Sequence, residues 1–343
     1  MPPPAPGPRA RPTMREVAAL AGVSLKTVSR VINAEPSVAP ELVARVNRAA
    51  TALDYRPNLT ARSLRSSGGR TLTIGVVLED VANPFSSALH RAVEDLARAR
   101  GIAVFAGSVD EDPERERALT SALISRRVDG LIMMPAGDDQ SYMANDQRAG
   151  LNLVFVDRPP RLLRADTVLS DNVRGAHDAV THLLAHGHTR IAFVGDLEDI
   201  PTATERFAGY RQALTEAGIA LEHELVVFGI RGPDAAEAVM GDLLAGPAPT
   251  AVFTAQNLIT IGAVRSLRNL GLRHRIALVG FDDFALSDLL EPPVTIVAQD
   301  PWAIGAAACQ RLFERMDGDG GPPQSVVIPT RLVARGSGEI RPG

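Results

Sequence analysis

The sequence predicts a small all-α module at the N-terminus and a larger α/β body built on parallel sheets. Apolar residues between 13 and 55 recur at helical spacing, whereas from Leu72 onward short β-rich runs alternate with amphipathic helical stretches. Such alternation is typical of a parallel sheet that helices cover on both faces. Because roughly 270 residues exceed one comfortable hydrophobic core, we expect two doubly wound parallel-sheet subdomains in the body.

The composition excludes several other classes of protein. The 343 residues are 45% apolar, and the 29 glycines and 25 prolines are scattered, which excludes collagen-like and low-complexity chains. Cys309 is the only cysteine, so neither an intrachain disulfide nor a Cys-based zinc site can form. The N-terminus lacks the apolar stretch of a signal peptide, and no run of about 18 apolar residues occurs. We therefore expect a cytoplasmic protein with no membrane contact.

Charge is distributed unevenly along the chain. Residues 1–70 contain 11 Lys and Arg but only four Asp and Glu, whereas the rest of the chain is acidic. A basic module joined to an acidic body indicates that the first part meets a polyanion and the second does not. Charge alone does not name the polyanion, and a solvated basic surface without a partner is the alternative.

The predicted all-α module follows a tail, residues 1–12, that is rich in Pro, Ala and Arg and is expected to be disordered. Thr13 and Glu16 have the spacing of a capping box, which predicts that a helix begins here. Gly22 lies in the turn that ends this helix, and Ser24 is the expected N-cap of the next. Two short helices joined by such a turn form a helix-turn-helix.

The second helix is the expected recognition helix. Val28 and Val31 point inward, and the outward set Leu25, Lys26, Thr27, Ser29 and Arg30 suits a major groove. Lys26 is the only lysine of the protein and lies at the start of this helix, where base edges are usually contacted. A helical hairpin with no DNA role is the alternative for a bare pattern of this kind, but the basic charge favours DNA.

Three motifs, which follow one another along the chain, distinguish this module from a generic helix-turn-helix: EVAALAGVS at 16–24, TVSRVIN at 27–33 and YRPN at 55–58. Together they resemble the headpiece of the lactose-repressor (LacI/GalR) family of transcription regulators. The chain departs from the family where a third helix begins, because Ala39 precedes Pro40 in place of the usual serine cap. The resemblance implies a DNA-binding domain at 13–57 that contacts DNA through Thr13, Ser24, Leu25, Lys26, Thr27, Ser29, Arg30, Asn33 and Tyr55.

Residues 58–70 resemble the hinge helix and linker of the family. A helix of about six residues is too short to be stable alone. The resemblance implies that the two hinges of a dimer pack together in the minor groove, where Leu64 wedges between base pairs. An inert flexible linker is the alternative. The contacts implied for this segment are Asn58, Ala61, Arg62 and Leu64.

The body, residues 71–343, contains the strand and helix candidates in alternation. The strand candidates are 72–78, 102–107, 130–134, 152–156, 191–195, 251–254 and 276–280, and helical windows include 85–100, 113–127, 172–186, 204–217 and 258–270. Motifs at 128–132, 155–158, 186–193, 205–210 and 279–283 also occur in this order in LacI/GalR bodies, so the resemblance covers about residues 13–340.

The resemblance implies a body similar to periplasmic binding proteins. Its N-subdomain would comprise about 71–167 and 299–328, and its C-subdomain about 168–298 and 329–343, with the chain crossing near 168, 298 and 328. Family tetramers use an added C-terminal leucine-repeat helix, which this chain does not show after Arg335. A homodimer is therefore expected.

Position by position, the resemblance also implies an effector cleft between the subdomains, with contacts from Asn83, Phe85, Asp157, Arg206, Gln256, Asp282 and Gln299. Carboxylates, a guanidinium and amides can each bridge neighbouring sugar hydroxyls, so a sugar or polyol is expected. A nucleoside is the alternative, although Ser86 replaces the second aromatic residue of the family's Asn-Pro-Phe-Phe turn. Each of these residues could instead serve the fold, and Gln256 is the weakest candidate, because Gln256-Asn257 stands where Asn-Asp is usual.

Other kinds of site are not supported. His182 and His186 lie four residues apart, with His188 close by, but in the family this segment closes a helix before a strand, so no metal is expected. No G-x-S-x-G, G-x-x-x-x-G-K-[ST] or G-x-G-x-x-G motif occurs, so neither an enzyme nor a cofactor is expected.

The sequence therefore predicts a ligand-responsive, sequence-specific DNA-binding regulator. We expect a repressor that binds a palindromic operator as a homodimer and that a sugar or polyol controls. A small-molecule receptor with no regulatory DNA role is the alternative from another class.

Overall fold

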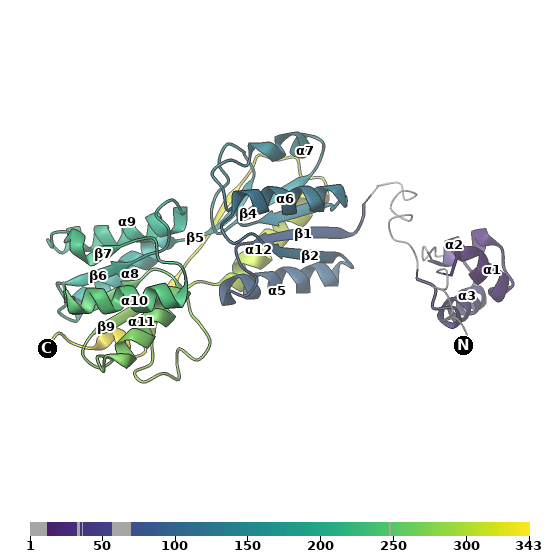
Figure 1. Ribbon diagram of the computed structural model, residues 1–343. Coiled ribbons are helices and arrows are strands. Elements are labelled where there is room, and N and C mark those ends of the chain that lie inside the picture. Colours follow the sequence, from purple (N-terminus) through teal and green to yellow (C-terminus); the bar gives the residue numbers. More distant parts are fainter. Residues whose placement is uncertain (1–11, 33–34, 36, 57–69, 247) are drawn as a thin grey trace, which may run out of the picture. The chain divides into compact units, whose positions relative to one another are not determined.

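The computed structural model describes residues 12–32, 35, 37–56, 70–246 and 248–343 (Figure 1). The chain divides into two compact units, Met1–Thr71 and Leu72–Gly343. The first unit contains three described helices: α1 Met14–Ala21, α2 Leu25–Ile32 and α3 Pro40–Ala52.

The helix-turn-helix forms as its capping residues predict. The backbone N of Thr13 donates to Oε2 of Glu16 at 2.6 Å, and the backbone N of Glu16 donates to Oγ1 of Thr13 at 3.4 Å, which completes the capping box. Gly22 ends α1 in the left-handed region at φ 62°, a conformation that glycine adopts without strain. Ser24 caps α2 by accepting from the backbone N of Thr27 at 3.1 Å.

The core of the module is formed by fully buried valines, one from each helix, namely Val17, Val28 and Val46. As the sequence indicates, α3 begins after Ala39 without a side-chain cap, and Pro40 occupies the first turn.

The first sheet of the body has the strand order β11-β5-β4-β3-β1-β2, with all pairs parallel. Helices α5 Pro84–Ala99 and α12 Pro301–Met316 cover one face, and α6 Pro113–Ser125 covers the other (Figure 1). Short helices η1 Ser141–Met143 and α7 Ala144–Arg148 precede β4. The strands are β1 Thr73–Leu78, β2 Ala103–Ser108, β3 Gly130–Met133, β4 Asn152–Val156, β5 Asp166–Ser170 and β11 Ser325–Ile328.

The second sheet has the order β12-β10-β9-β8-β6-β7. Helices α8 Asn172–Ala185 and α9 Pro201–Glu216 pack on one face, and α10 Gly232–Ala245 and α11 Asn257–Asn269 pack on the other. Two 3-10 helices, η2 His223–Leu225 and η3 Ser337–Glu339, complete this half. The strands are β6 Ile191–Val194, β7 Val226–Val227, β8 Ala251–Thr254, β9 Ala277–Phe281, β10 Thr295–Ala298 and β12 Arg331–Val333.

The chain passes between the two sheets three times: from β5 to α8, from β10 to α12, and from β11 to β12. The last passage gives the second sheet an antiparallel edge, because β12 pairs antiparallel with β10. Only residues 329–330 separate β11 from β12. The chain therefore leaves the first sheet at its carboxyl edge and enters the second sheet from that sheet's own carboxyl edge, against the direction of the other strands.

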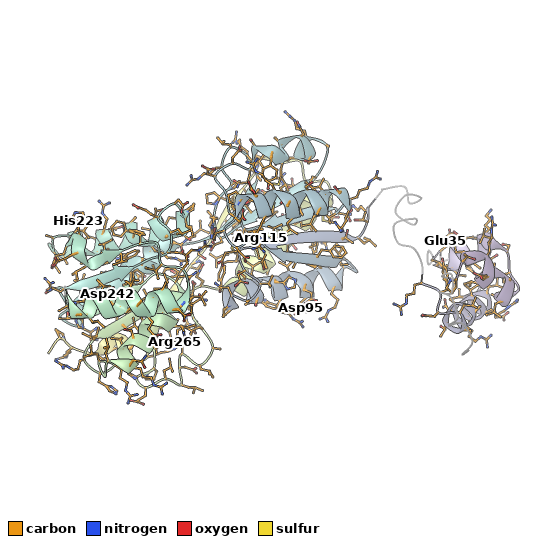
Figure 2. The ribbon with its side chains drawn as sticks, in the orientation of Figure 1. Glu35, Asp95, Arg115, His223, Asp242 and Arg265 are labelled. Carbon is orange, nitrogen blue, oxygen red and sulfur yellow. The ribbon has the colours of Figure 1, made fainter. Side chains whose placement is uncertain are left out.

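The predicted fold class is confirmed, with this antiparallel edge as an addition. Charged side chains such as Arg115, His223 and Arg265 are exposed and project from the helices and loops of the body into solvent (Figure 2). Among the described residues, no helix is long and apolar enough to cross a membrane.

Candidate functional site

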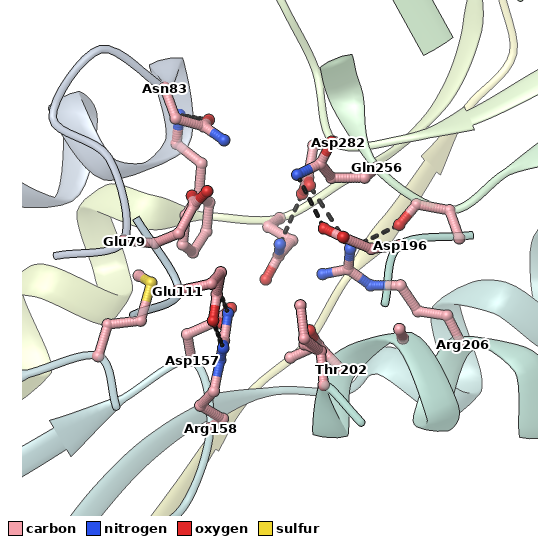
Figure 3. A pocket seen from close by; sticks show the side chains of 16 residues that line it. Glu79, Asn83, Glu111, Asp157, Arg158, Asp196, Thr202, Arg206, Gln256 and Asp282 are labelled. Atoms are coloured by element: carbon pink, nitrogen blue, oxygen red, sulfur yellow. Dashed lines mark hydrogen bonds and ion pairs between the residues drawn. The ribbon is translucent and has the colours of Figure 1, made fainter. Parts of the chain in front are cut away.

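A cleft lies between the two sheets of the body, where the carboxyl ends of their strands face each other (Figure 3). The space between its lining side chains, open mouth included, is about 460 Å³. All seven residues predicted to contact an effector line it: Asn83, Phe85, Asp157, Arg206, Gln256, Asp282 and Gln299.

Arg206 of α9 is fixed by several neighbours. Its Nε donates to Oδ1 of Asn172 at 2.9 Å, and its Nη1 donates to the carbonyl oxygen of Ala255 at 2.7 Å. The guanidinium carbon lies 3.9 Å from the centre of the Phe281 ring. Glycine at 209 is required nearby, because a Cβ there would clash with the carbonyl oxygen of Val173 and prevent this approach of α9 to α8. A buried guanidinium held in this way presents a fixed positive charge to the cleft.

Asp282 faces Arg206 at the same end of the cleft. Its Oδ2 lies 3.7 Å from Nη1 of Arg206, and its Oδ1 accepts from Nε2 of Gln299 at 2.5 Å. Gln299 in turn accepts a hydrogen bond from the hydroxyl of Ser170. Burial raises the pKa of the Asp282 carboxyl, and the charge of Arg206 and the hydrogen bond from Gln299 oppose that shift. The carboxylate is thus poised to accept hydrogen bonds from a ligand.

Asp157 and Asp282 occupy matching positions in the two halves. Each directly follows a buried strand, β4 and β9 respectively, and each has a left-handed backbone, with φ 67° for Asp157 and 69° for Asp282. This conformation is uncommon for a residue other than glycine, and Asp tolerates it better than most. Backbone strain of this kind is concentrated at functional sites.

The N-subdomain side of the cleft contains an ion-pair network that the sequence did not predict. Nη1 and Nη2 of Arg158 donate to the two carboxylate oxygens of Glu111 at 2.7 and 2.8 Å, and Nε donates to Oδ2 of Asp157 at 3.3 Å. These side chains are only about 8% exposed. Arg158 therefore orients Asp157 toward the cleft. Arg158 directly follows Asp157, a predicted site residue, and this position was the sequence feature that could have identified it.

Asn83 and Gln256 have structural roles as well as positions in the cleft. Oδ1 of Asn83 accepts from the backbone N of Phe85 at 3.0 Å, which caps α5, and from Nδ2 of Asn257 at 3.0 Å across the cleft. Nε2 of Gln256 donates to Oδ2 of Asp196 at 3.3 Å, while its Oε1 is buried without a hydrogen-bond partner among the described residues. An unpaired buried acceptor leaves a place for a donor.

Glu79 and Asp196 also line the cleft and were not predicted. Glu79 follows β1 and Asp196 lies two residues after β6, so the rule that parallel strands end at one edge could have found them. Burial, with the charge of Glu111 as the next cause, raises the pKa of Glu79 to about 7. Burial also raises the pKa of Asp196, against the opposing charges of Arg158, Arg231 and Arg206.

The helix-turn-helix presents a second candidate surface. Ser24, Leu25 and Lys26 are exposed at the start of α2, and Thr27 and Ser29 are half-buried. Arg30 is already paired within the module, because its Nε donates to Oε2 of Glu35 at 2.8 Å and its Nη2 to Oγ of Ser37 at 2.5 Å.

The other predicted DNA contacts are placed differently. Thr13 belongs to the capping box and Tyr55 packs against the core of the module. The remaining predicted contacts, together with the predicted hinge helix, lie outside the described residues: Asn33, Asn58, Ala61, Arg62 and Leu64.

Arg45 of α3 was not predicted as part of this surface. Its Nη2 donates to the carbonyl oxygens of Ala21 and Gly22 at 2.6 and 3.1 Å, which joins the third helix to the turn. The histidines do not form a metal site: His182 hydrogen-bonds to Glu339 and His188 to the carbonyl oxygen of Ile340, and the described residues contain no metal-ligating group of three.

Comparison with known proteins decides the family. The family model of bacterial regulatory proteins of the lacI family matches residues 13–58, and that of a periplasmic binding protein-like domain matches residues 180–338. The HTH-type transcriptional regulator DegA of Bacillus subtilis (strain 168) is 32% identical over 332 residues, which cover 95% of this chain and 97% of DegA. The chain belongs to the LacI family of transcriptional regulators.

Solved structures of transcriptional regulators match this chain along most of its length. A complex of the transcriptional regulator CelR with cellobiose is 32% identical and covers 95% of this chain and 100% of its own, with a TM-score of 0.71. The lac repressor dimer bound to operator and the anti-inducer ONPF is 27% identical and covers 96% and 99%, with a TM-score of 0.84. The predictions of a LacI-family regulator and of a protein that is not an enzyme are confirmed.

Proposed function

We propose that this LacI-family regulator is a repressor whose operator binding is controlled by a sugar or polyol in the cleft of its body. The observation that carries the proposal is that one cleft brings together all seven residues expected to contact an effector. Asp157, Arg206, Asp282 and Gln299 offer paired donors and acceptors to neighbouring hydroxyls, and Phe85 offers an apolar face. A relative in complex with cellobiose supports this ligand class.

On the DNA side, we propose that α2 reads base edges in the major groove through Leu25 and Lys26. Two copies of the chain would form a homodimer, and twofold-related recognition helices require a palindromic operator. Leu64 of each hinge would wedge between central base pairs in the minor groove. The relative solved as a dimer on its operator supports this arrangement.

The cleft offers a route for control. Contacts between its two walls include the bond from Asn257 to Asn83 and a bond of 3.0 Å from Nη2 of Arg231 to the carbonyl oxygen of Asp110. A ligand held by both walls favours one relative position of the subdomains. If that position changes DNA affinity, the coupling free energy is typically about 1 to 3 kcal/mol.

The test has two stages. Selection of the full-length protein against random duplexes should yield a palindrome, and fluorescence anisotropy should show an affinity that falls by about 10³- to 10⁵-fold between 50 and 200 mM salt. A panel of sugars, polyols and nucleosides is then titrated into the complex. A sugar or polyol should change operator affinity at least about fivefold. A response to nucleosides alone would refute the effector class, and equal affinity for scrambled duplexes would refute the DNA role.

A further inference from the structure

The cleft contains more carboxylates than cations. Its lining includes five carboxylates, while its cations are the guanidinium groups of Arg158 and Arg206, with no lysine or histidine. Three carboxylates come from the N-subdomain and two from the C-subdomain, and all follow the ends of parallel strands: Glu79, Glu111, Asp157, Asp196 and Asp282. A ligand therefore enters a negative field.

Arg158 is fully engaged by carboxylates, and Arg206 keeps only Nη2 without a partner among the described residues. Both terminal nitrogens of Arg158 donate to Glu111, and its Nε donates to Asp157. Arg206 donates to Asn172 and Ala255 and lies beside Asp282. Arg231 lies near Asp196 but outside the lining, and it donates to the carbonyl oxygen of Asp110. A phosphate or carboxylate in the cleft would meet five carboxylates and only the part of Arg206 that is not already bound.

Glu79 and Asp196 are the two lining carboxylates that form no salt bridge with a described residue. They face the cleft from opposite sides (Figure 3). No described residue forms a hydrogen bond or salt bridge with the Glu79 carboxylate, and Asp196 accepts only from the backbone N of Leu197 and from Gln256. Burial and the charge of Glu111 raise the pKa of Glu79, and the negative charge of Asp196 adds to that shift.

The wall of the cleft that carries Asp196 also contains an unpaired hydrogen-bond acceptor. Oε1 of Gln256 is buried without a partner, while Nε2 of the same side chain is used by Asp196. Carboxylates and an amide oxygen only accept hydrogen bonds, so Glu79, Asp196 and Oε1 of Gln256 need donors from the ligand. A protonated amine carries three donors, no acceptor and the missing positive charge.

Resting on the proposed function, we propose that the effector is a polyhydroxylated compound with a protonated amine, of the amino-sugar class, whose ammonium group binds between Glu79 and Asp196. The hydroxyls occupy the Asp157, Arg206 and Asp282 end of the cleft. Sugar phosphates and sugar acids are excluded by repulsion, because like charges a few ångströms apart in a partly buried site repel strongly.

The test uses matched ligands on three skeletons: glucose, galactose and mannose. Each is compared with its 2-amino, 2-acetamido and 6-phosphate forms by isothermal titration calorimetry against the full-length protein at pH 7. On any skeleton that binds, the amine should bind at least roughly tenfold more tightly than the neutral sugar, which is about 1.4 kcal/mol. The acetamide, which keeps the nitrogen but not the charge, should lose this advantage, and the phosphate should not bind.

Two variants locate the ammonium subsite. E79Q removes one charge with little change of shape and should lower the ratio of amine to neutral-sugar affinity roughly tenfold. E224Q, at an exposed carboxylate outside the cleft lining, should leave that ratio unchanged. An unchanged ratio in E79Q would overturn the subsite.

The outcomes separate the two proposals. A neutral sugar that binds as tightly as its amine, or a phosphate that binds at all, overturns the charge selection but leaves a sugar-controlled repressor intact. An amine that binds without changing operator affinity overturns the proposed control but not the subsite. If no compound on any skeleton binds, the amino-sugar proposal is overturned, and the wider panel of sugars, polyols and nucleosides decides the proposed function.

Discussion

Asn257 and Asn83 join the two walls of the cleft through one hydrogen bond, from Nδ2 of Asn257 to Oδ1 of Asn83 at 3.0 Å. Both side chains are buried, and they lie at the first turns of α11 and α5, which belong to different subdomains. The same Oδ1 also caps α5 through the backbone N of Phe85. One oxygen therefore takes part both in the start of α5 and in a link between the two walls of the cleft.

Asn257→Ala should weaken the contact between the two walls of the cleft. The substitution removes the bond to Asn83 but leaves the α5 cap in place, so we expect a loss of about 1 kcal/mol of unfolding free energy. Hydrogen exchange should increase in residues 80–86 and 256–260 of the ligand-free protein. Asn269→Ala is the matched control, since Asn269 lies on the same helix, is exposed and donates to Glu237. Equal hydrogen-exchange rates in both variants would show that the bond from Asn257 to Asn83 does not hold the two walls together.

The fold and the cleft were predictable from sequence to different degrees. Alternating apolar runs predicted the α/β class, but β5, β7, β10, β11 and β12 were not among the strand candidates. Strand β12 has only three residues, and its direction depends on the passage of the chain from one sheet to the other. Pairing of this kind is a property of the assembled sheet, which local periodicity does not encode.

The residues of the cleft were also predicted only in part. The residues implied by family motifs all line it, whereas Glu79, Glu111, Arg158 and Asp196 were missed. Glu111 and Arg158 are 47 positions apart, and only the alignment of parallel strands brings them together. In the DNA-binding module, helical spacing predicted the buried valines but not the pairing of Arg30 with Glu35, which follows from the turn before α3.

Asp282→Asn should shift the response to ligand to roughly ten- to a hundredfold higher ligand concentrations, while operator binding without ligand changes by no more than about twofold. The amide keeps the size of the side chain but replaces a charged acceptor, and a hydrogen bond to a charged group is worth about 1.5 to 3 kcal/mol. We therefore expect ligand affinity to fall roughly ten- to a hundredfold in calorimetry with the effector from the screen. Because burial already disfavours the charged carboxyl, the variant should remain folded.

Asp283→Asn is the matched control for this prediction. Asp283 is the next residue along the chain, but its carboxylate binds Arg335 at 2.6 and 2.9 Å and lies outside the cleft lining. This substitution should lower thermal stability and spare ligand affinity. Undiminished ligand binding in Asp282→Asn would refute the assigned cleft.

Glu79 should make the body less stable as pH rises. Burial raises its pKa to about 7 from the ordinary value of 4.5, so the folded state holds its proton more tightly than the unfolded state does. The resulting loss of stability begins above the unfolded pKa and is complete above the folded one, which places it between about pH 4.5 and 7. Above that window E79Q should exceed the parent in unfolding free energy by about 1 to 3 kcal/mol.

Urea unfolding of the ligand-free protein at pH 5 and pH 8 measures this effect. The unfolding free energy of E79Q should exceed that of the parent at pH 8, and the difference should be small at pH 5. E224Q, at an exposed carboxylate, should gain nothing at either pH. A gain of equal size at both pH values would mean that the amide improves packing and that titration of Glu79 is not the cause.

Lys26→Ala should change which bases the protein prefers. Lys26 is exposed at the start of α2, and its ammonium group can donate to O6 and N7 of guanine in the major groove. Loss of a base contact of this kind removes about 1 to 3 kcal/mol of discrimination at one position of each half-site. Selection from random duplexes, followed by sequencing, should therefore show a relaxed consensus at one symmetric pair of positions. Arg48→Ala on α3 is the control, since an exposed cation away from α2 should affect affinity for all duplexes alike and leave the consensus unchanged. An identical consensus for Lys26→Ala and the parent would remove Lys26 from the set of base-reading residues.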